Sequence, residues 1–227
     1  MTISHLDLIR KAHIFRGVPA AEFTTMLESL DSQLKSYRSG QIVIPAGRRV
    51  RRAGLLLEGS VTVYRTDFWS EKHFLETIRP GSIFLESFAC AEKRVTNIFV
   101  RADIPSVILW FNIQDILRLD DSCDYHSILV RNLMNEISAK NIDLNAKIVH
   151  MSQHTTKEKL LSYLSEESIR QNSSEFDIPF DRQQLADYLS VERSAMAAVL
   201  SSLVKDGYLK TKKNHFILLP GPGDSQE

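Results

Sequence analysis

The sequence predicts an α+β chain with three parts: a β-rich N-terminal domain, one long helix, and a C-terminal helical module that ends in a β hairpin. Three observations predict this order. Short segments rich in β-branched and aromatic residues run from residue 34 to residue 111. An apolar repeat at helical spacing follows between residues 130 and 151. Two further helical patterns, separated by a break at residues 190–192, precede two short β segments.

The first 30 residues predict short helices, because Phe23, Met26, Leu27 and Leu30 recur at helical spacing. Beyond them, turn residues divide the chain into many short β segments, and this pattern predicts a jelly roll or a sandwich. The turn signals are Ser39-Gly40, Ala46-Gly47, Glu58-Gly59, Pro80-Gly81 and Ile104-Pro105.

One long helix is expected from residue 125 to residue 151. Its apolar residues step by four and three positions, which is a heptad pattern, and Asn141 fills the one gap. Such a seam favours a two-stranded dimer whose single polar residue fixes the register. The alternative is an amphipathic helix that packs on its own domain. The predicted interface comprises Val130, Met134, Ile137, Asn141, Leu144, Ile148 and, at its end, Met151.

A new helix is expected over residues 157–168, because Thr155 and Glu158 have the spacing of a capping box. The polar break at residues 152–154, just before this helix, predicts a hinge between the two halves of the chain. A polar loop is expected at residues 171–174, after the helix has ended.

The last 40 residues of the folded part predict a winged helix-turn-helix. Asp181 and Gln184 form a second capping-box pair, which starts a short helix over residues 182–189. After the break, a longer helix runs until Asp206-Gly207 ends it, and the β segments then follow. Two helices joined by a tight turn are a means of placing side chains in a DNA major groove. The residues expected to face the core are Leu185, Ala186, Leu189, Met196, Val199, Leu200 and Leu203.

The outward face of the longer helix favours DNA binding over a plain helical hairpin. A solvated helix face usually carries long Glu and Lys side chains at i,i+4 spacing, whereas this one carries a single cation and small residues. The basic turn at residues 212–215 joins β segments expected at residues 208–210 and 216–219. The predicted DNA contacts are Arg182, Gln183, Glu192, Arg193, Ser194, Ala197, Ala198, Ser201, Lys212 and Lys213.

The run IPFDRQQLADYLSVERSAMAAVLSSLVKDGYLKTKKNHFILL resembles the DNA-binding domain of the Crp–Fnr family of bacterial transcription regulators. The resemblance continues upstream through the long helix to PGSIFLESFA and NIFVRA, and so covers nearly the whole chain. It implies a homodimer of subunits with a jelly-roll effector domain, a dimerisation helix and a winged helix-turn-helix. The divisions expected here are residues 1–120, 121–151 and 152–220, with a disordered tail at 221–227.

The sequence departs from the cyclic-AMP-binding members of this family at the residues that hold the ligand, so we do not expect cyclic AMP to be the effector. Cyclic-AMP-binding members hold the ribose with a Gly-Glu pair after a Pro-Gly turn, and the phosphate with an Arg-Ser pair ten residues after the Glu. Here Glu86 matches, but Leu85 replaces the glycine, and Thr96 with Asn97 stand in the place of the Arg-Ser pair. Arg94 lies two residues early. Without a guanidinium fork, the cyclic phosphate would lose its bidentate contact.

A mostly apolar pocket for a small organic effector is expected instead. Phe88, Phe99 and Trp110 are candidate lining residues, although alternation predicts the last two as core residues. For Glu86, the alternative is a surface carboxylate at a strand end. The predicted effector contacts are Phe84, Glu86, Ser87, Arg94, Thr96, Asn97 and Asn145.

Cofactor and membrane chemistries are not expected. An iron–sulfur cluster needs four thiolates, and the chain has only Cys90 and Cys123, for which inert thiols are favoured over a redox pair. We expect no metal site. Net charge is zero, so a basic surface must be local. No apolar run approaches the ~20 residues that cross a bilayer, and a cytoplasmic protein is expected.

The sequence therefore predicts a DNA-binding transcription regulator, not an enzyme. We expect it to be a homodimer on a palindromic operator in double-stranded DNA, with RNA polymerase and an unidentified small-molecule effector as further partners. Two alternatives stay open: a ligand-independent DNA-binding dimer with a vestigial pocket, and a jelly-roll enzyme with an accessory helical domain.

Overall fold

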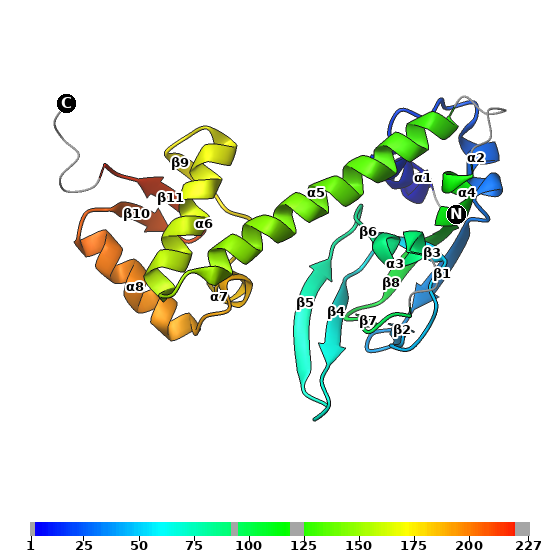
Figure 1. Cartoon of the computed structure of the whole chain (residues 1–227). Helices are drawn as coiled ribbons and strands as arrows, with labels where there is room; N and C mark the ends of the chain where they lie inside the picture. Colours follow the sequence, from blue (N-terminus) through cyan, green and yellow to red (C-terminus); the bar gives the residue numbers. More distant parts are fainter. Residues whose placement is uncertain (1–2, 92–94, 119–124, 221–227) are drawn as a thin grey trace. The chain divides into compact units, whose positions relative to one another are not determined.

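The computed structural model describes residues 3–91, 95–118 and 125–220 (Figure 1). The chain divides into two compact units, residues 1–139 and 140–227, and helix α5 (His126–Ser152) contributes to both. The predicted α+β class and the order of a β-rich domain, a long helix and a helix-turn-helix are confirmed.

The first unit begins with short helices and continues with short antiparallel strands, as predicted. Its elements are α1 (Ile3–Lys11), η1 (His13–Phe15), α2 (Phe23–Ser29), β1 (Gln33–Tyr37), β2 (Ile42–Ile44), β3 (Arg52–Glu58), β4 (Val61–Thr66), β5 (Lys72–Ile78), β6 (Ile83–Phe84), α3 (Glu86–Cys90), β7 (Phe99–Ala102), β8 (Ser106–Asn112) and α4 (Ile113–Leu117).

The strands form two four-stranded sheets, ordered β1-β8-β3-β6 and β2-β7-β4-β5. Side chains from both sheets, including Leu56, Val63, Val100 and Ile108, make one core between them. A second core lies between the first sheet and the helices, where Leu55, among others, packs. Strand β3 is therefore buried on both faces, which explains why it reads as the apolar run AGLLLE and not as an alternating strand.

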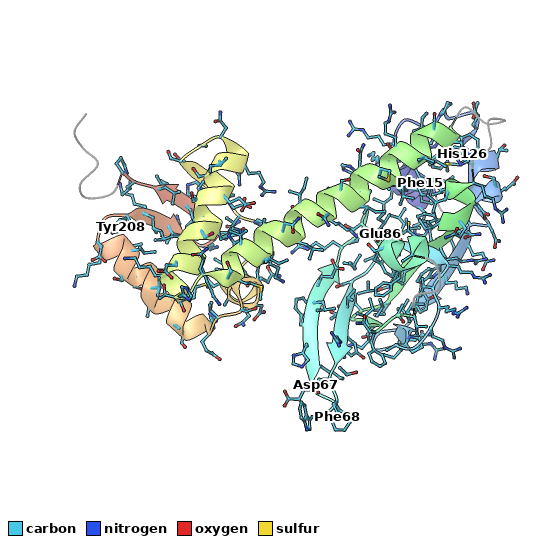
Figure 2. All side chains as sticks on the ribbon, in the orientation of Figure 1. Phe15, Asp67, Phe68, Glu86, His126 and Tyr208 are labelled. Atoms are coloured by element: carbon cyan, nitrogen blue, oxygen red, sulfur yellow. The ribbon has the colours of Figure 1, made fainter. Side chains whose placement is uncertain are left out.

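The hairpin of β4 and β5 carries the most exposed aromatic side chains among the described residues. Strand β5 is at the edge of its sheet and is exposed except at Ile78. Figure 2 shows Asp67 and Phe68 at the tip of this hairpin, where Phe68 is 92% and Trp69 80% exposed. The Asp67 carboxylate accepts hydrogen bonds from the backbone N–H groups of Trp69 and Glu71, which fixes the turn.

The second unit contains the end of α5 and the helix-turn-helix. Its further elements are α6 (Thr156–Gln171), β9 (Glu175–Asp177), α7 (Arg182–Leu189), α8 (Arg193–Lys205), β10 (Leu209–Lys212) and β11 (His215–Leu218). The strands form an antiparallel sheet ordered β10-β11-β9. A single hydrophobic core joins this sheet to the three helices, with Leu164, Leu185, Met196, Leu203 and Phe216 fully buried.

The structure corrects three details of the prediction for this unit. Helix α6 is longer than expected at both ends, and strand β9 was not predicted. The wing strands include Lys212 and His215, so the turn is shorter than the expected basic turn and has Lys213 in the left-handed region at φ 55°. The disordered tail expected at residues 221–227 lies outside the described residues.

Candidate nucleic-acid interface and effector region

The first helix of the helix-turn-helix is built as its capping residues predict. The Asp181 carboxylate accepts from the backbone N–H of Gln184 at 2.8 Å, and the Gln184 side chain accepts from the N–H of Asp181 at 3.0 Å. Leu185 and Ala186 are fully buried on the inner face of α7, and Ser190 ends the helix in the left-handed region at φ 51°. The small side chain of Ala186 permits the close crossing of α8.

In its first three turns, the exposed face of α8 carries one cation and small side chains, as predicted, and Lys205 is exposed at the end of the helix. Arg193, Ser194, Ala197, Ala198 and Ser201 are exposed, while the opposite face is buried in the core. The guanidinium of Arg193 has no hydrogen bond or ion pair with any residue that the structure describes, so it is available to a ligand. This face lies along a groove of about 840 Å³ lined by Arg182, Glu192, Arg193, Ser194, Met196, Ala197, Leu200, Ser201, Val204 and Thr211.

Arg182 ties the start of α7 to the wing. Its Nη2 donates to the Thr211 hydroxyl at 2.7 Å, and its guanidinium lies 4.9 Å from the centre of the Phe216 ring. Burial lowers the pKa of Arg182, although an arginine stays protonated at any ordinary pH. Thr211, which the sequence analysis missed, in turn donates to the carbonyl of His215 at 2.8 Å. Arg182 of the helix and Thr211 of the wing thus line the groove as a hydrogen-bonded pair.

The remaining predicted DNA contacts lie at the rim. Gln183 is exposed and its side chain donates to Asp187 at 2.8 Å, while Glu192 is exposed and makes no side-chain cap to α8. Lys212 and Lys213 are exposed at the turn of the wing. All the predicted contacts except Gln183, Ala198, Lys212 and Lys213 line one groove.

His150 holds the end of α5 to α6 inside the second unit. Its side chain is 2% exposed, Nδ1 lies 2.8 Å from the Ser162 hydroxyl, and Nε2 lies 3.2 Å from a carboxylate oxygen of Glu166. The ring also packs edge-on against Tyr163 and near Tyr188 of α7. Burial raises the pKa of Tyr188 to about 12, so this hydroxyl stays neutral.

Stability should fall in mild acid because of His150. Burial lowers its pKa and outweighs the opposite effect of Glu166 and Glu167, so the folded chain keeps neutral an imidazole that the unfolded chain protonates near pH 6.5. We expect the free energy of unfolding to decrease from pH 7.5 to pH 5.5, and to decrease less in His150→Gln. Urea unfolding across this pH range measures both. The exposed His154→Gln is the matched control, and equal pH dependence in all three proteins would contradict the assignment.

His150 and His154 do not form a metal pair, although they are four positions apart in the sequence. Helix α5 ends at Ser152, so the two imidazoles do not share a helix face. No group of three or more His, Cys, Asp or Glu side chains suited to a metal occurs within the described part of the chain. Cys90 is half-buried, and burial, with a smaller effect from Glu86, raises the pKa of its thiol, which disfavours the reactive thiolate. Cys123 lies outside the described residues.

In the effector region, Leu85 replaces the glycine of the family's Gly-Glu pair and holds a backbone conformation that is strained for leucine. Leu85 adopts the left-handed conformation at φ 65°, where glycine is favoured, and its side chain is buried in the core between the sheets. Glu86 follows as the first residue of α3 and is 3% exposed (Figure 2), so it is not the surface carboxylate offered as the alternative.

The other predicted effector contacts differ in exposure and in hydrogen bonding. Thr96 is buried, and its hydroxyl donates to the carbonyl of Pro45 at 3.4 Å, while Ser87 and Asn97 are exposed. Asn145 belongs to the second unit and donates to the Asn141 side chain at 2.9 Å. Arg94 lies outside the described residues.

Phe84 is a core residue, which argues against the predicted ligand contact. Its ring packs edge-on against Trp110 with centroids 5.5 Å apart, and it fills the space that a Cβ at Gly54 would enter. Trp110 is confirmed as a core residue and donates to the Tyr37 hydroxyl at 3.0 Å. Phe99 is half-buried and stacks on Tyr64.

The residues of the predicted seam are largely uncovered in the single chain. Met134, Leu144 and Ile148 are 58%, 59% and 63% exposed, whereas Val130 and Ile137 pack partly against the core of the first unit. The N-terminal half of α5 therefore packs on its own domain, as the alternative for this helix predicts, and the dimer interface stays a prediction. Ile142 and Val149 are also exposed, but they lie outside the predicted seam, about 100° around the helix from Asn141 and Ile148.

Comparison with known proteins matches both parts of the chain. Residues 34–122 match the cyclic nucleotide-binding domain, and residues 158–222 match the Crp-like helix-turn-helix domain. No relative was found among curated protein sequences. None of the described helices has the length and apolar character needed to cross a membrane.

Solved structures similar to this chain share its fold at low sequence identity. CprK complexed with OCPA has a TM-score of 0.60 and 16% identity, covering 88% of this chain and 90% of that one. CLP, the c-di-GMP responsive global regulator of Xanthomonas campestris, has a TM-score of 0.58 and 15% identity, covering 89% of this chain and 100% of that one. The sensor domain of DNR from Pseudomonas aeruginosa has a TM-score of 0.51 and 23% identity, covering 61% of this chain and 91% of that one.

Proposed function

Because this chain belongs to the Crp–Fnr family of DNA-binding transcription regulators with an effector domain, we propose that it acts as a cytoplasmic homodimer on a palindromic operator. Its effector is a small molecule other than cyclic AMP. The observation that carries this proposal is the groove along α8, where an unpaired guanidinium and small side chains are exposed beside the wing. Such a face fits the width of a major groove.

Two-fold symmetry sets the geometry of the operator. A dimer that places one α8 in each of two major grooves needs half-sites about one helical turn, ~34 Å, apart. The exposed apolar surface of α5 supports the dimer, because uncovered side chains of this size favour association. RNA polymerase is the further protein partner that a regulator of this family would need for its output.

Salt dependence tests the proposed DNA contact. Full-length protein should bind a selected palindromic duplex with an affinity that falls steeply as salt increases, because cationic side chains displace condensed counterions. Lys212→Ala should weaken binding to every duplex alike and reduce the salt slope by about one per contact removed. Fluorescence anisotropy between about 50 and 200 mM salt measures both. An affinity that changes neither with salt concentration nor with the sequence of the duplex would contradict the proposal.

Three features support an effector other than cyclic AMP. The buried Leu85 stands in place of the glycine, the Thr96 hydroxyl already donates to Pro45, and Asn97 offers no cation to a phosphate. CLP is described as c-di-GMP responsive and CprK was solved with OCPA, so the fold accommodates other ligands.

We expect calorimetry to detect no tight binding of cyclic AMP, because Thr96 and Asn97, which stand in the place of the Arg-Ser pair, cannot make the bidentate contact of an arginine to the phosphate. The matched gain-of-function control is the variant Leu85→Gly, Thr96→Arg, Asn97→Ser, which restores the three family residues and should bind better than the wild type. Micromolar or tighter cyclic AMP binding by the wild type would contradict this expectation, and would make Arg94 the candidate phosphate contact.

The second candidate is a dimer that binds DNA without an effector. It is favoured by one observation: Leu85 belongs to the packed core between the sheets. A metabolite screen by thermal shift, followed by operator titrations with and without each hit, separates the two. Equal operator affinity under all conditions would favour the ligand-independent dimer.

A further inference from the structure

Hydrogen-bond donors are scarce on the exposed face of α8. The Ser201 hydroxyl donates to the carbonyl of Ala197 at 3.0 Å, so its proton is used within the helix. Ser202 likewise donates to the Asp206 carboxylate at 3.0 Å. Among the described residues in the first three turns of this face, Arg193 and Ser194 have donors that no side-chain bond engages, and the next such donor is Lys205 at the far end of the helix.

Methyl groups occupy the rest of this face. Ala197 lines the groove together with Val204, which is 43% exposed, and Ala198 is exposed on the other flank. At 3.6 residues per turn, Ala197 and Ala198 lie on either side of the line that joins Ser194 to Ser201. A base pair that approaches this line therefore meets methyl groups on both sides.

Thymine is the base whose major-groove edge suits such a surface. Its C5 methyl is an apolar group that alanine contacts directly, whereas guanine, adenine and cytosine present donors and acceptors that alanine cannot satisfy. Desolvating their polar edges against methyl groups would cost free energy with no compensating hydrogen bond. Sequences with thymine opposite the alanines are thus favoured over all others.

We infer that Ala197 and Ala198 determine specificity by reading thymine methyl groups in each operator half-site. This inference rests on the proposed function and names the sequence class that the groove accepts. Four or five residues along a helix span about 6–7.5 Å, and base pairs are about 3.4 Å apart. The thymines should therefore lie about two base pairs from the base that contacts Arg193.

The experiment starts from duplexes selected out of a randomised library by the full-length protein. Each selected thymine near the Arg193 position is then replaced by deoxyuridine, which removes only the C5 methyl. Loss of one buried methyl should weaken binding about fourfold per half-site. Affinities for the thymine and uracil duplexes are compared in the wild type, in Ala198→Gly and in Ala197→Gly.

Ala195→Gly is the matched control, because Ala195 is exposed on α8 but lies about 100° around the helix from Ser194, on the side away from Ala197. We expect it to keep the preference for thymine, while at least one of the other two variants loses it. A uracil effect of the same size in all four proteins would assign the preference to DNA deformability and overturn the inference. Selected half-sites without thymine, or no uracil effect at all, would also overturn it. Failure to select any sequence would instead count against the proposed function.

Discussion

Arg193→Ala should remove most of the discrimination at one base pair of each half-site. Arg193 is the exposed guanidinium at the start of α8, lines the groove, and can fork onto the O6 and N7 atoms of guanine. Loss of one such bidentate contact costs about 1–3 kcal/mol per half-site. Because the neighbouring exposed residues are small or, in Glu192, acidic, none of them can donate to the two guanine acceptors in its place.

Binding across a panel of duplexes that differ at every half-site position measures this effect. Specificity should relax at a single position in Arg193→Ala and stay intact at the others. Lys213→Ala, in the turn of the wing, is the matched control and should lower affinity equally for every duplex. If Arg193→Ala behaves like Lys213→Ala, the arginine contacts phosphate and does not read a base.

The sequence predicts the helix-turn-helix well because its signals are local. A capping box involves residues three positions apart, and both boxes, at Thr155 and at Asp181, occur where the spacing indicates. The bounds of α7 follow directly from the second box. Strand β9, by contrast, contains three residues and exists because Phe176 pairs with Phe216 of β11, forty positions away. No local pattern in EFD indicates that pairing.

The effector region is less predictable for the same reason. Alternation places Phe84 on one face of a strand, but only the approach of Gly54 from β3 shows that the ring is enclosed in the core. Similarly, heptad spacing identifies a seam on α5 without showing that Val130 and Ile137 also pack on their own domain. Burial depends on which distant element covers a residue, and spacing along the chain does not encode it.

Because part of the seam also packs on its own domain, the choice of substitutions matters in a test of the dimer interface. Ile137→Asp with Leu144→Asp should give a monomer, since each charge would be buried unpaired in the interface. Ile137, however, also packs against the core of its own unit, so that variant could lose stability for a second reason. Leu144→Asp with Ile148→Asp avoids the difficulty, because both side chains are about 60% exposed in the single chain, at 59% and 63%. Their replacement should leave the fold of the subunit unchanged.

Sedimentation velocity should therefore show the Leu144→Asp, Ile148→Asp variant as a folded monomer at concentrations where the wild type is a dimer. The affinity of this variant for a palindromic duplex should fall toward its affinity for a single half-site. Ala139→Asp is the control, because it adds a charge to an exposed position about 140° around α5 from Leu144 and should remain dimeric. Asn141→Leu should still associate, but with a looser register or a changed oligomeric state, as the polar residue of a seam fixes both. If the double aspartate variant remains a dimer, α5 does not form the interface. Another surface of the subunit would then have to hold the two α8 helices one turn of DNA apart on the palindromic operator.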